Sequence, residues 1–519
     1  SMLKNIFLII FILFFVHFFF SSLLCAIKED KLDKRIIKFF VIMGLMGYGT
    51  FWAFYFGKII GYIVVILQCA TIFYMARKQI KIEAHLLPTF LATIILALIG
   101  LFPYSGMSVQ ELANNRWLVL TGDNWIPKIL LNQVWEGKIL HPMMGDWLSS
   151  DRPPLQAGIA LFFQAIGIAG SWAYQGVGMY LQCLILLAMI PFWRLLGLQK
   201  YTALLTTGLV FSTLLLIHAV FVWPKLLAAS YLILLYVYLN SKIDLFQNDR
   251  IPGWCWGGAL IALAMLSHGG SAFALIVIVL ATFCTTRPWK GIHTIKSLAA
   301  SLCIYLPWII YQRFIDPPGD RLLKWHIGGH IAPTNDSLLT VILNSYQNLS
   351  FETWWQSKIG NLYTVFGSYI TFPTQLSEIF SRHMIERSFF EFSVSFWLLW
   401  PVGLFCFLWL VIRRQTEPHY IRLAIVSVLG LILWCMLMFD AGSAVLHQGS
   451  FFFWLAIYSI FIASIIKIFR EQWAIIFIAL NSGLIILAFL FATNTLILLP
   501  IAMIGAYFIG KKTHELCQN

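Results

Sequence analysis

Two polar stretches between long apolar runs carry residue types that can do acid–base and phosphate chemistry. The first contains Asp123, and the second ends in Asp151-Arg152 before two prolines. A carboxylate within hydrogen-bond reach can take the proton of an attacking hydroxyl. A guanidinium can meet a departing phosphate with two parallel hydrogen bonds. These residues together fit a group transfer in which a phosphate leaves.

Asp123 stands at the start of a predicted amphipathic helix within residues 122–137. Its apolar positions repeat at helical spacing: Ile126, Ile129, Leu130 and Val134. Pro127 suits the first turn and Gly137 suits the end of the helix. Asp123 therefore sits where an N-cap would. It either only caps the helix or is the carboxylate that takes the proton in the chemistry above.

Asp151 and Arg152 precede Pro153-Pro154 and an apolar helix that opens at Pro154 or Leu155. Backbone before proline is restricted to extended conformations, which would hold this acidic-basic pair out of the helix. The pair could act in the site, with Arg152 on a phosphate. The alternative is an interfacial ion pair that anchors a loop.

Further cations lie in two other polar segments. Asp316-Pro317-Pro318-Gly319 predicts a turn, followed by a short basic and aromatic helix that contains Arg321 and Lys324. This helix could be a lid or a phosphate clamp at the membrane interface, or it could merely anchor a loop. Lys225, in a shorter turn, is a further candidate to help Arg152 with the phosphate.

His268 and His447 each end an apolar helix on the same predicted side as these cations. Ionisable groups near the membrane are candidates for a site, although a lone histidine at a helix end is more often structural. Carboxylates and histidines could together hold a divalent cation, but no ligand spacing demands one. The sequence requires no cofactor, and it contains no nucleotide or zinc motif.

The composition places the chain in a membrane, because 60% of its residues are hydrophobic and only 11% are charged. A crossing takes about 20 apolar residues, and about fifteen runs of this kind lie between Leu3 and Gly510. The net charge of +13 comes from short basic clusters between these runs, so it indicates topology and not nucleic acid binding. We predict an all-α polytopic membrane protein.

Lys and Arg gather in alternate loops, which the positive-inside rule assigns to the cytoplasm. Inner and outer loops alternate consistently along the chain only if the stretch 155–168 does not cross the membrane and lies instead as a juxtamembrane helix. Two long polar segments, 103–154 and 315–395, then fall on the outer face with the candidate site residues.

The same pattern predicts four parts of the chain. Residues 1–83 hold N-terminal transmembrane helices, and residues 84–314 form a catalytic transmembrane core that includes the first outer loop. Residues 315–395 are the second outer loop with interfacial helices, and residues 396–519 hold the C-terminal transmembrane helices.

The order of features in the first outer loop resembles the GT-C superfamily of glycosyltransferases. An Asp opens an amphipathic helix, a Gly closes it, Pro142 follows, and an acidic-basic-Pro-Pro-Leu run covers 151–155. The nearest branch holds aminoarabinose transferases and protein O-mannosyltransferases, family 39-like enzymes. The resemblance implies a GT-C-like helix bundle in which Asp123 is the catalytic aspartate, Asp151 the second loop carboxylate and Arg152 the cation on the lipid phosphate.

These observations predict a glycosyltransferase in the inner membrane of a bacterium, with its site facing the periplasm. The donor would be a sugar on polyprenyl phosphate and the acceptor a lipid, glycan or protein. One alternative is a transporter or flippase of lipid-linked glycans, which should show internal repeats and charges at mid-helix depth. Another is an O-antigen polymerase or ligase.

Overall fold

The computed structural model describes residues 2–78, 81–102, 106–115, 122–241, 245–284, 288–366, 381, 396–441 and 451–518. Helices make up nearly all regular structure in these ranges, and no strand is present in them. Nine of the described helices are long and apolar enough to cross a membrane, or ten if one bent pair counts as a span. The prediction of an all-α polytopic membrane protein is confirmed.

Four long helices begin the bundle: α1 (Met2–Ala26), α2 (Leu32–Phe56), α3 (Lys58–Ala76) and, after the short turn η1 (Ala84–Leu86), α4 (Leu87–Leu101). Helix α2 approaches a later helix, α7 (Leu155–Ala165), through two glycines. A Cβ on Gly158 would collide with the backbone oxygen of Gly47. Only a residue without a side chain lets these two helices come so close.

The first polar segment contains α5 (Val109–Asn115), η2 (Gly122–Trp125), α6 (Ile126–Glu136) and η3 (Ser149–Asp151). Helix α6 ends at Gly137 with a φ of 71°, the left-handed conformation that glycine adopts most readily. Helix α7 has 11 residues, so it spans about 16 Å and is too short to cross about 30 Å of hydrocarbon. It lies inside the bundle, packed on α2 and α6.

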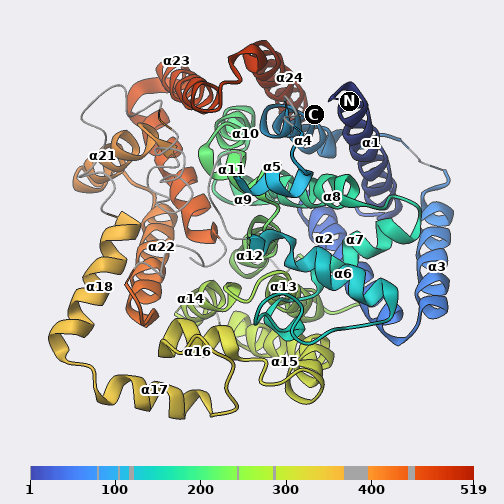
Figure 1. Ribbon diagram of the computed structural model, residues 1–519. Helices are drawn as coiled ribbons and strands as arrows, with labels where there is room; N and C mark the ends of the chain where they lie inside the picture. Colours follow the sequence, from blue (N-terminus) through green and yellow to red (C-terminus); the bar gives the residue numbers. More distant parts are fainter. Residues whose placement is uncertain are drawn as a thin grey trace.

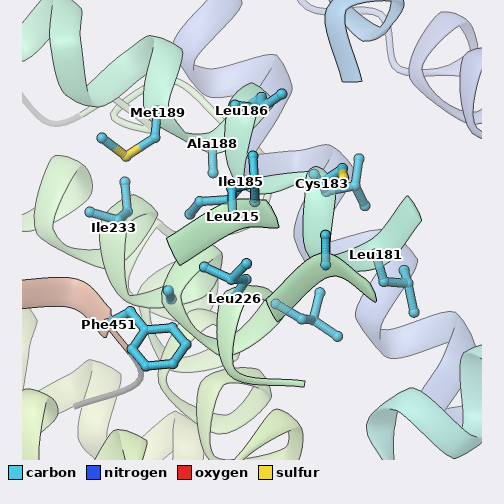
Figure 2. Packing of buried hydrophobic residues seen from close by; sticks show 14 of the residues in the cluster. Leu181, Cys183, Ile185, Leu186, Ala188, Met189, Leu215, Leu226, Ile233 and Phe451 are labelled. Atoms are coloured by element: carbon cyan, nitrogen blue, oxygen red, sulfur yellow. The ribbon is translucent and has the colours of Figure 1, made fainter. Parts of the chain in front are cut away.

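The central bundle runs from α8 to α15: α8 (Ser171–Cys183), α9 (Ile185–Leu195), α10 (Thr202–Val210, after η4 Gln199–Tyr201), α11 (Thr213–Phe221), α12 (Lys225–Asn240), α13 (Gly253–Ser267), α14 (Ser271–Phe283) and α15 (Pro288–Ile310). Helices α8 and α9 form one span, and α10 and α11 bend by 61° at their junction. Buried side chains of α8, α9, α11 and α12 interdigitate with Phe451 in the core (Figure 2).

The chain continues through the π-helical turn η5 (Tyr311–Ile315), α16 (Arg321–Gly328), α17 (Leu338–Gln347) and α18 (Phe351–Phe366), then α21 (Leu399–Ile412), α22 (Pro418–Leu437), α23 (Phe452–Ala492), η10 (Leu496–Leu498) and α24 (Leu499–Gln518). Helices α17 and α18 lie at the margin of the bundle (Figure 1). Helix α23 breaks at Arg470, where φ is 62° and ψ is 162°. The break lies between the apolar runs Phe451–Ile466 and Ala474–Phe491, which the sequence predicts as two separate spans.

Loops that the sequence assigns to the cytoplasm contact one another. Lys38 pairs with Glu29 at 2.9 Å and with Asp249 at 2.8 Å, and Arg35 pairs with Glu83 at 2.7 Å. The two predicted outer segments also contact each other, as the ion pair of Asp151 with Arg321 illustrates. The two sets of loops therefore gather separately, as alternating spans require. The four-part division of the chain stays a prediction.

Candidate functional site

Asp123 and Arg152 form a direct ion pair. Arg152 Nη2 donates to Asp123 Oδ2 at 3.0 Å, and the Asp123 side chain is 18% exposed while that of Arg152 is buried. Helix α6 begins after Trp125 without any side-chain cap, so Asp123 does not serve as its N-cap. The carboxylate is held by a cation and stays open to solvent.

Two tryptophans surround the Arg152 guanidinium. Its Cζ lies 4.6 Å from the ring centre of Trp147 and 5.7 Å from that of Trp223, distances at which a ring face attracts a cation. Burial lowers the pKa of Arg152, and the charges of Asp123 and Asp151 act in the opposite direction. Because the ordinary pKa of arginine is above 12, the group remains a cation at neutral pH.

Lys225 and His268 both lie beside the ring of Trp223. Lys225 Nζ is 3.6 Å from the centre of the Trp223 ring, and the His268 ring lies edge-on at 6.0 Å from that ring. Burial, with the charges of Lys225 and Arg152, holds the pKa of His268 well below its ordinary value. The structure thus brings four predicted site residues, Asp123, Arg152, Lys225 and His268, into one electrostatic environment.

His326 of α16 borders the same environment. Burial lowers its pKa to about 4, and the charges of Arg152 and Lys225 contribute to the shift. A neutral imidazole at this position leaves Arg152 as the fixed cation, because burial and the Arg152 charge hold the pKa of Lys225 well below its ordinary value. Arg152 beside the partly open Asp123 therefore gives an anion a guanidinium to contact.

Asp151 and Arg321 join the two outer segments. The buried Asp151 carboxylate accepts from the backbone N–H of Leu148 at 2.9 Å and from Arg321 Nη1 at 3.1 Å. Burial raises the pKa of Asp151, while the Leu148 N–H and the Arg321 charge oppose that shift. Asp151 therefore fixes the backbone beside Arg152 through its pair with Arg321, while Asp123 pairs with Arg152 itself.

Arg321 directs its donors to protein oxygens. Its side chain is 2% exposed, with Nη1 on the Asp146 carbonyl at 2.8 Å, Nη2 on the Asp146 carboxylate at 2.6 Å and Nε on the Ile331 carbonyl at 3.0 Å. Lys324 Nζ similarly contacts Asp320 at 2.6 Å and the Thr334 carbonyl at 3.0 Å. Direct binding of substrate by Arg321 or Lys324 stays a prediction. His447 lies outside the described residues.

Asp316 makes a second connection between the outer segments. Its Oδ2 accepts from Ser149 Oγ at 2.5 Å and from the Ser150 N–H at 3.0 Å. Ser149 also hydrogen-bonds Tyr311 Oη at 2.5 Å. The short turn η3, which leads into Arg152, is therefore held by the chain at η5.

Several buried polar atoms beside the ion pair have no hydrogen-bond partner among the described residues. They are Asn124 Oδ1 and Nδ2, Asp151 Oδ1 and Arg152 Nε. An unsatisfied buried group costs about 1–3 kcal/mol, and such groups in native structures call for an explanation. A polar ligand or water bound beside Arg152 would satisfy them. No group of three His, Cys, Asp or Glu residues placed to hold a metal occurs within the described ranges.

The sequence did not single out the tryptophans that contact the cations. Trp223 stands directly before Pro224-Lys225, and Trp147 follows Asp146 in the first outer segment. A tryptophan adjacent to a candidate cation was the available signal. Its meaning depends on the tertiary contact with Arg152, which no local pattern reveals.

No protein-family model matches the chain, and no curated protein matches it in sequence. Among solved structures, the chain is similar to ArnT from Cupriavidus metallidurans bound to undecaprenyl phosphate, with a TM-score of 0.42 and 11% identity. The match covers 78% of this chain and 74% of that one. The likeness is distant.

Proposed function

We propose that this chain is a GT-C-type glycosyltransferase that moves a sugar from a polyprenyl-phosphate donor to an acceptor on the outer face of the membrane. The observation that carries the proposal is the ion pair of Asp123 with Arg152, a partly open carboxylate on a buried guanidinium. A base and a phosphate-binding cation in contact are what a transfer with a phosphate leaving group needs.

Binding of the donor would exchange partners within the pair. The donor phosphate competes for the Arg152 guanidinium, whose Nε is buried without an acceptor among the described residues. A phosphate takes two parallel hydrogen bonds from such a fork. Asp123 then loses part of its hold on Arg152 and becomes free to accept a proton.

The reaction proceeds by single displacement. The acceptor oxygen forms the new bond to the anomeric carbon, and the bond between that carbon and the phosphate oxygen breaks. The leaving phosphate keeps the electron pair, while the acceptor proton passes to Asp123. Arg152, with Lys225 beside the same Trp223 ring, offsets the negative charge that grows on the phosphate.

The donor and acceptor locations follow from this chemistry. A polyprenyl chain lies in the bilayer, so its phosphate is presented where the outer segments meet the helices. The acceptor, a lipid, glycan or protein, would approach from the periplasm of a bacterial inner membrane. A divalent cation is a possible addition that no described ligand group requires.

The test is transfer of a radiolabelled sugar from synthetic polyprenyl-phosphate donors by the purified protein in lipid nanodiscs. Asp123→Asn should lower the transfer rate by about 10²–10⁴, the usual contribution of a general base. Asp336→Asn is the matched control, because Asp336 is an exposed aspartate in the second outer segment and should leave the rate unchanged.

Two results would overturn the proposal. One is full activity of Asp123→Asn with every donor that the native protein uses. The other is a native protein that transfers no sugar from any donor tested but moves lipid-linked glycans across vesicle membranes, which would make it a flippase.

A further inference from the structure

A cavity of about 320 Å³ lies at the opposite end of α6 from Asp123. Its walls come from the end of α6 and the loop that follows, from the end of α2, and from η5: Tyr55, Val134, Ile139, His141, Tyr311 and Ile315. Helix α6 has 11 residues, so about 16 Å separates the cavity from the start of the helix beside Asp123. The length of α6 thus separates the cavity from Asp123.

His141 is oriented by a buried carboxylate. Its Nδ1 lies 3.0 Å from Asp316 Oδ1, and the His141 side chain is 38% exposed whereas Asp316 is buried. Nδ1, this close to a carboxylate oxygen, carries the proton of the imidazole ring, because a lone pair on Nδ1 would be repelled by that oxygen. Nε2, on the other edge of the ring, is then the nitrogen available to a ligand.

Tyr55 supplies a second polar group and an aromatic wall. Its ring meets that of Tyr311 edge to face, with centres 5.7 Å apart and planes at 84°. Tyr311 Oη is already bonded to Ser149, but Tyr55 Oη has no hydrogen bond among the described residues. Val134, Ile139 and Ile315 complete the cavity with aliphatic surface.

Among the described residues that line the cavity, none is a lysine, arginine, aspartate or glutamate. His141 is the one titratable side chain besides the tyrosines in that lining, and it faces the Asp316 carboxylate. An anion such as phosphate would find no unpaired cation here, in contrast to the surroundings of Arg152. The volume suits one small ligand. The walls call for a ligand with hydroxyls on its rim and apolar C–H faces.

We propose that this cavity binds an uncharged sugar ring, with hydroxyls on His141 Nε2 and Tyr55 Oη and with its C–H face on the aliphatic wall. The proposal goes beyond the proposed function, because binding of a free sugar does not require transfer. If the chain is the transferase proposed above, this ring is a remote unit of a glycan acceptor.

Binding is tested with methyl β-glucopyranoside, methyl β-galactopyranoside and methyl N-acetyl-β-glucosaminide, each titrated onto the full chain by saturation-transfer-difference NMR. The protein is held in lipid nanodiscs, because glucoside and maltoside detergents would compete. At least one of the three sugars should bind. Ile139→Trp fills the cavity and should weaken sugar binding by about tenfold or more, which corresponds to about 1.4 kcal/mol. Leu140→Trp is the matched control, since Leu140 is 62% exposed and does not line the cavity.

Modification of His141 gives a readout that does not depend on a bulky substitution. Bound sugar should slow the carbethoxylation of His141 by diethyl pyrocarbonate, and mass spectrometry measures the rate of that modification. The His141→Gln substitution should weaken sugar binding. Asp123→Asn should bind the sugar as the native protein does. Failure of all three sugars to bind, equal binding by Ile139→Trp and Leu140→Trp, or competition by inorganic phosphate would each overturn the proposal. Loss of transfer with sugar binding intact would contradict the proposed function alone.

Discussion

Arg321 and Asp151 are 170 positions apart in the chain, yet Arg321 Nη1 lies 3.1 Å from Asp151 Oδ2 in a fully buried ion pair. Arg321 also holds both the carbonyl and the carboxylate of Asp146. The second outer segment thus fastens the first directly beside Arg152. In the proposed reaction Arg152 contacts the substrate. Its position depends on the contacts of Arg321 with Asp151 and Asp146, a clamp that does not itself contact the substrate.

Arg321→Ala should lower the free energy of unfolding by about 3–5 kcal/mol, because it leaves Asp151 as a buried charge without its partner. Thermal unfolding of the protein in nanodiscs measures the loss. Arg313→Ala is the control, since Arg313 is an exposed arginine in the same region and its removal should shift the unfolding temperature little. Equal unfolding temperatures for the two variants would show that the clamp contributes nothing.

Arg152→Lys should lower kcat/KM for the lipid donor by about 10- to 100-fold. A lysine keeps the charge, but it lacks the planar fork that binds a phosphate through two hydrogen bonds, and a charge-assisted hydrogen bond is worth about 1.5–3 kcal/mol. Steady-state transfer assays measure the ratio. Arg313→Lys serves as the control for loss of an arginine on this face. A variant with native kcat/KM would exclude phosphate binding by the Arg152 fork.

Local pattern was sufficient to predict the elements that carry the site. Pro127 and Gly137 mark the first turn and the end of α6, and the structure begins and ends the helix there. The basic stretch that ends at Arg470 separates two apolar runs, and α23 breaks at that residue. These features depend on neighbouring residues in the chain, so they are visible without the fold.

The contacts of the cations could not be predicted in the same way. Arg321 and Lys324 have the composition of a phosphate clamp, but their donors meet Asp146, Ile331 and Thr334 in the structure. Which acceptor a buried cation finds depends on segments distant in sequence. Helices α12, α13, α14 and α21 have 13 to 16 residues, fewer than the about 20 that a straight crossing takes.

The stability of the native protein should fall as pH is lowered from about 6.5 to about 4, in part through His326. Burial lowers the native pKa of His326 from 6.5 to about 4, so in this window the unfolded chain binds a proton that the folded chain does not. The neutral form therefore stabilises the fold above this window, and the contribution is lost on acidification. Unfolding temperatures of native protein and His326→Gln across pH 4–7 test this. Parallel curves would show that His326 does not contribute.

Gly158→Ala should destabilise the bundle by about 1–3 kcal/mol, the usual cost of excess volume in a packed core. The added Cβ would meet the backbone oxygen of Gly47, and a backbone atom cannot move aside as a side chain can. Gly483→Ala is the matched control, because Gly483 lies within α23 and a Cβ there meets nothing within 4 Å. The control should be neutral or more stable, since alanine restricts the unfolded chain more than glycine. Thermal unfolding in nanodiscs separates the two, and an unaltered unfolding temperature for Gly158→Ala would mean that α2 and α7 lie further apart.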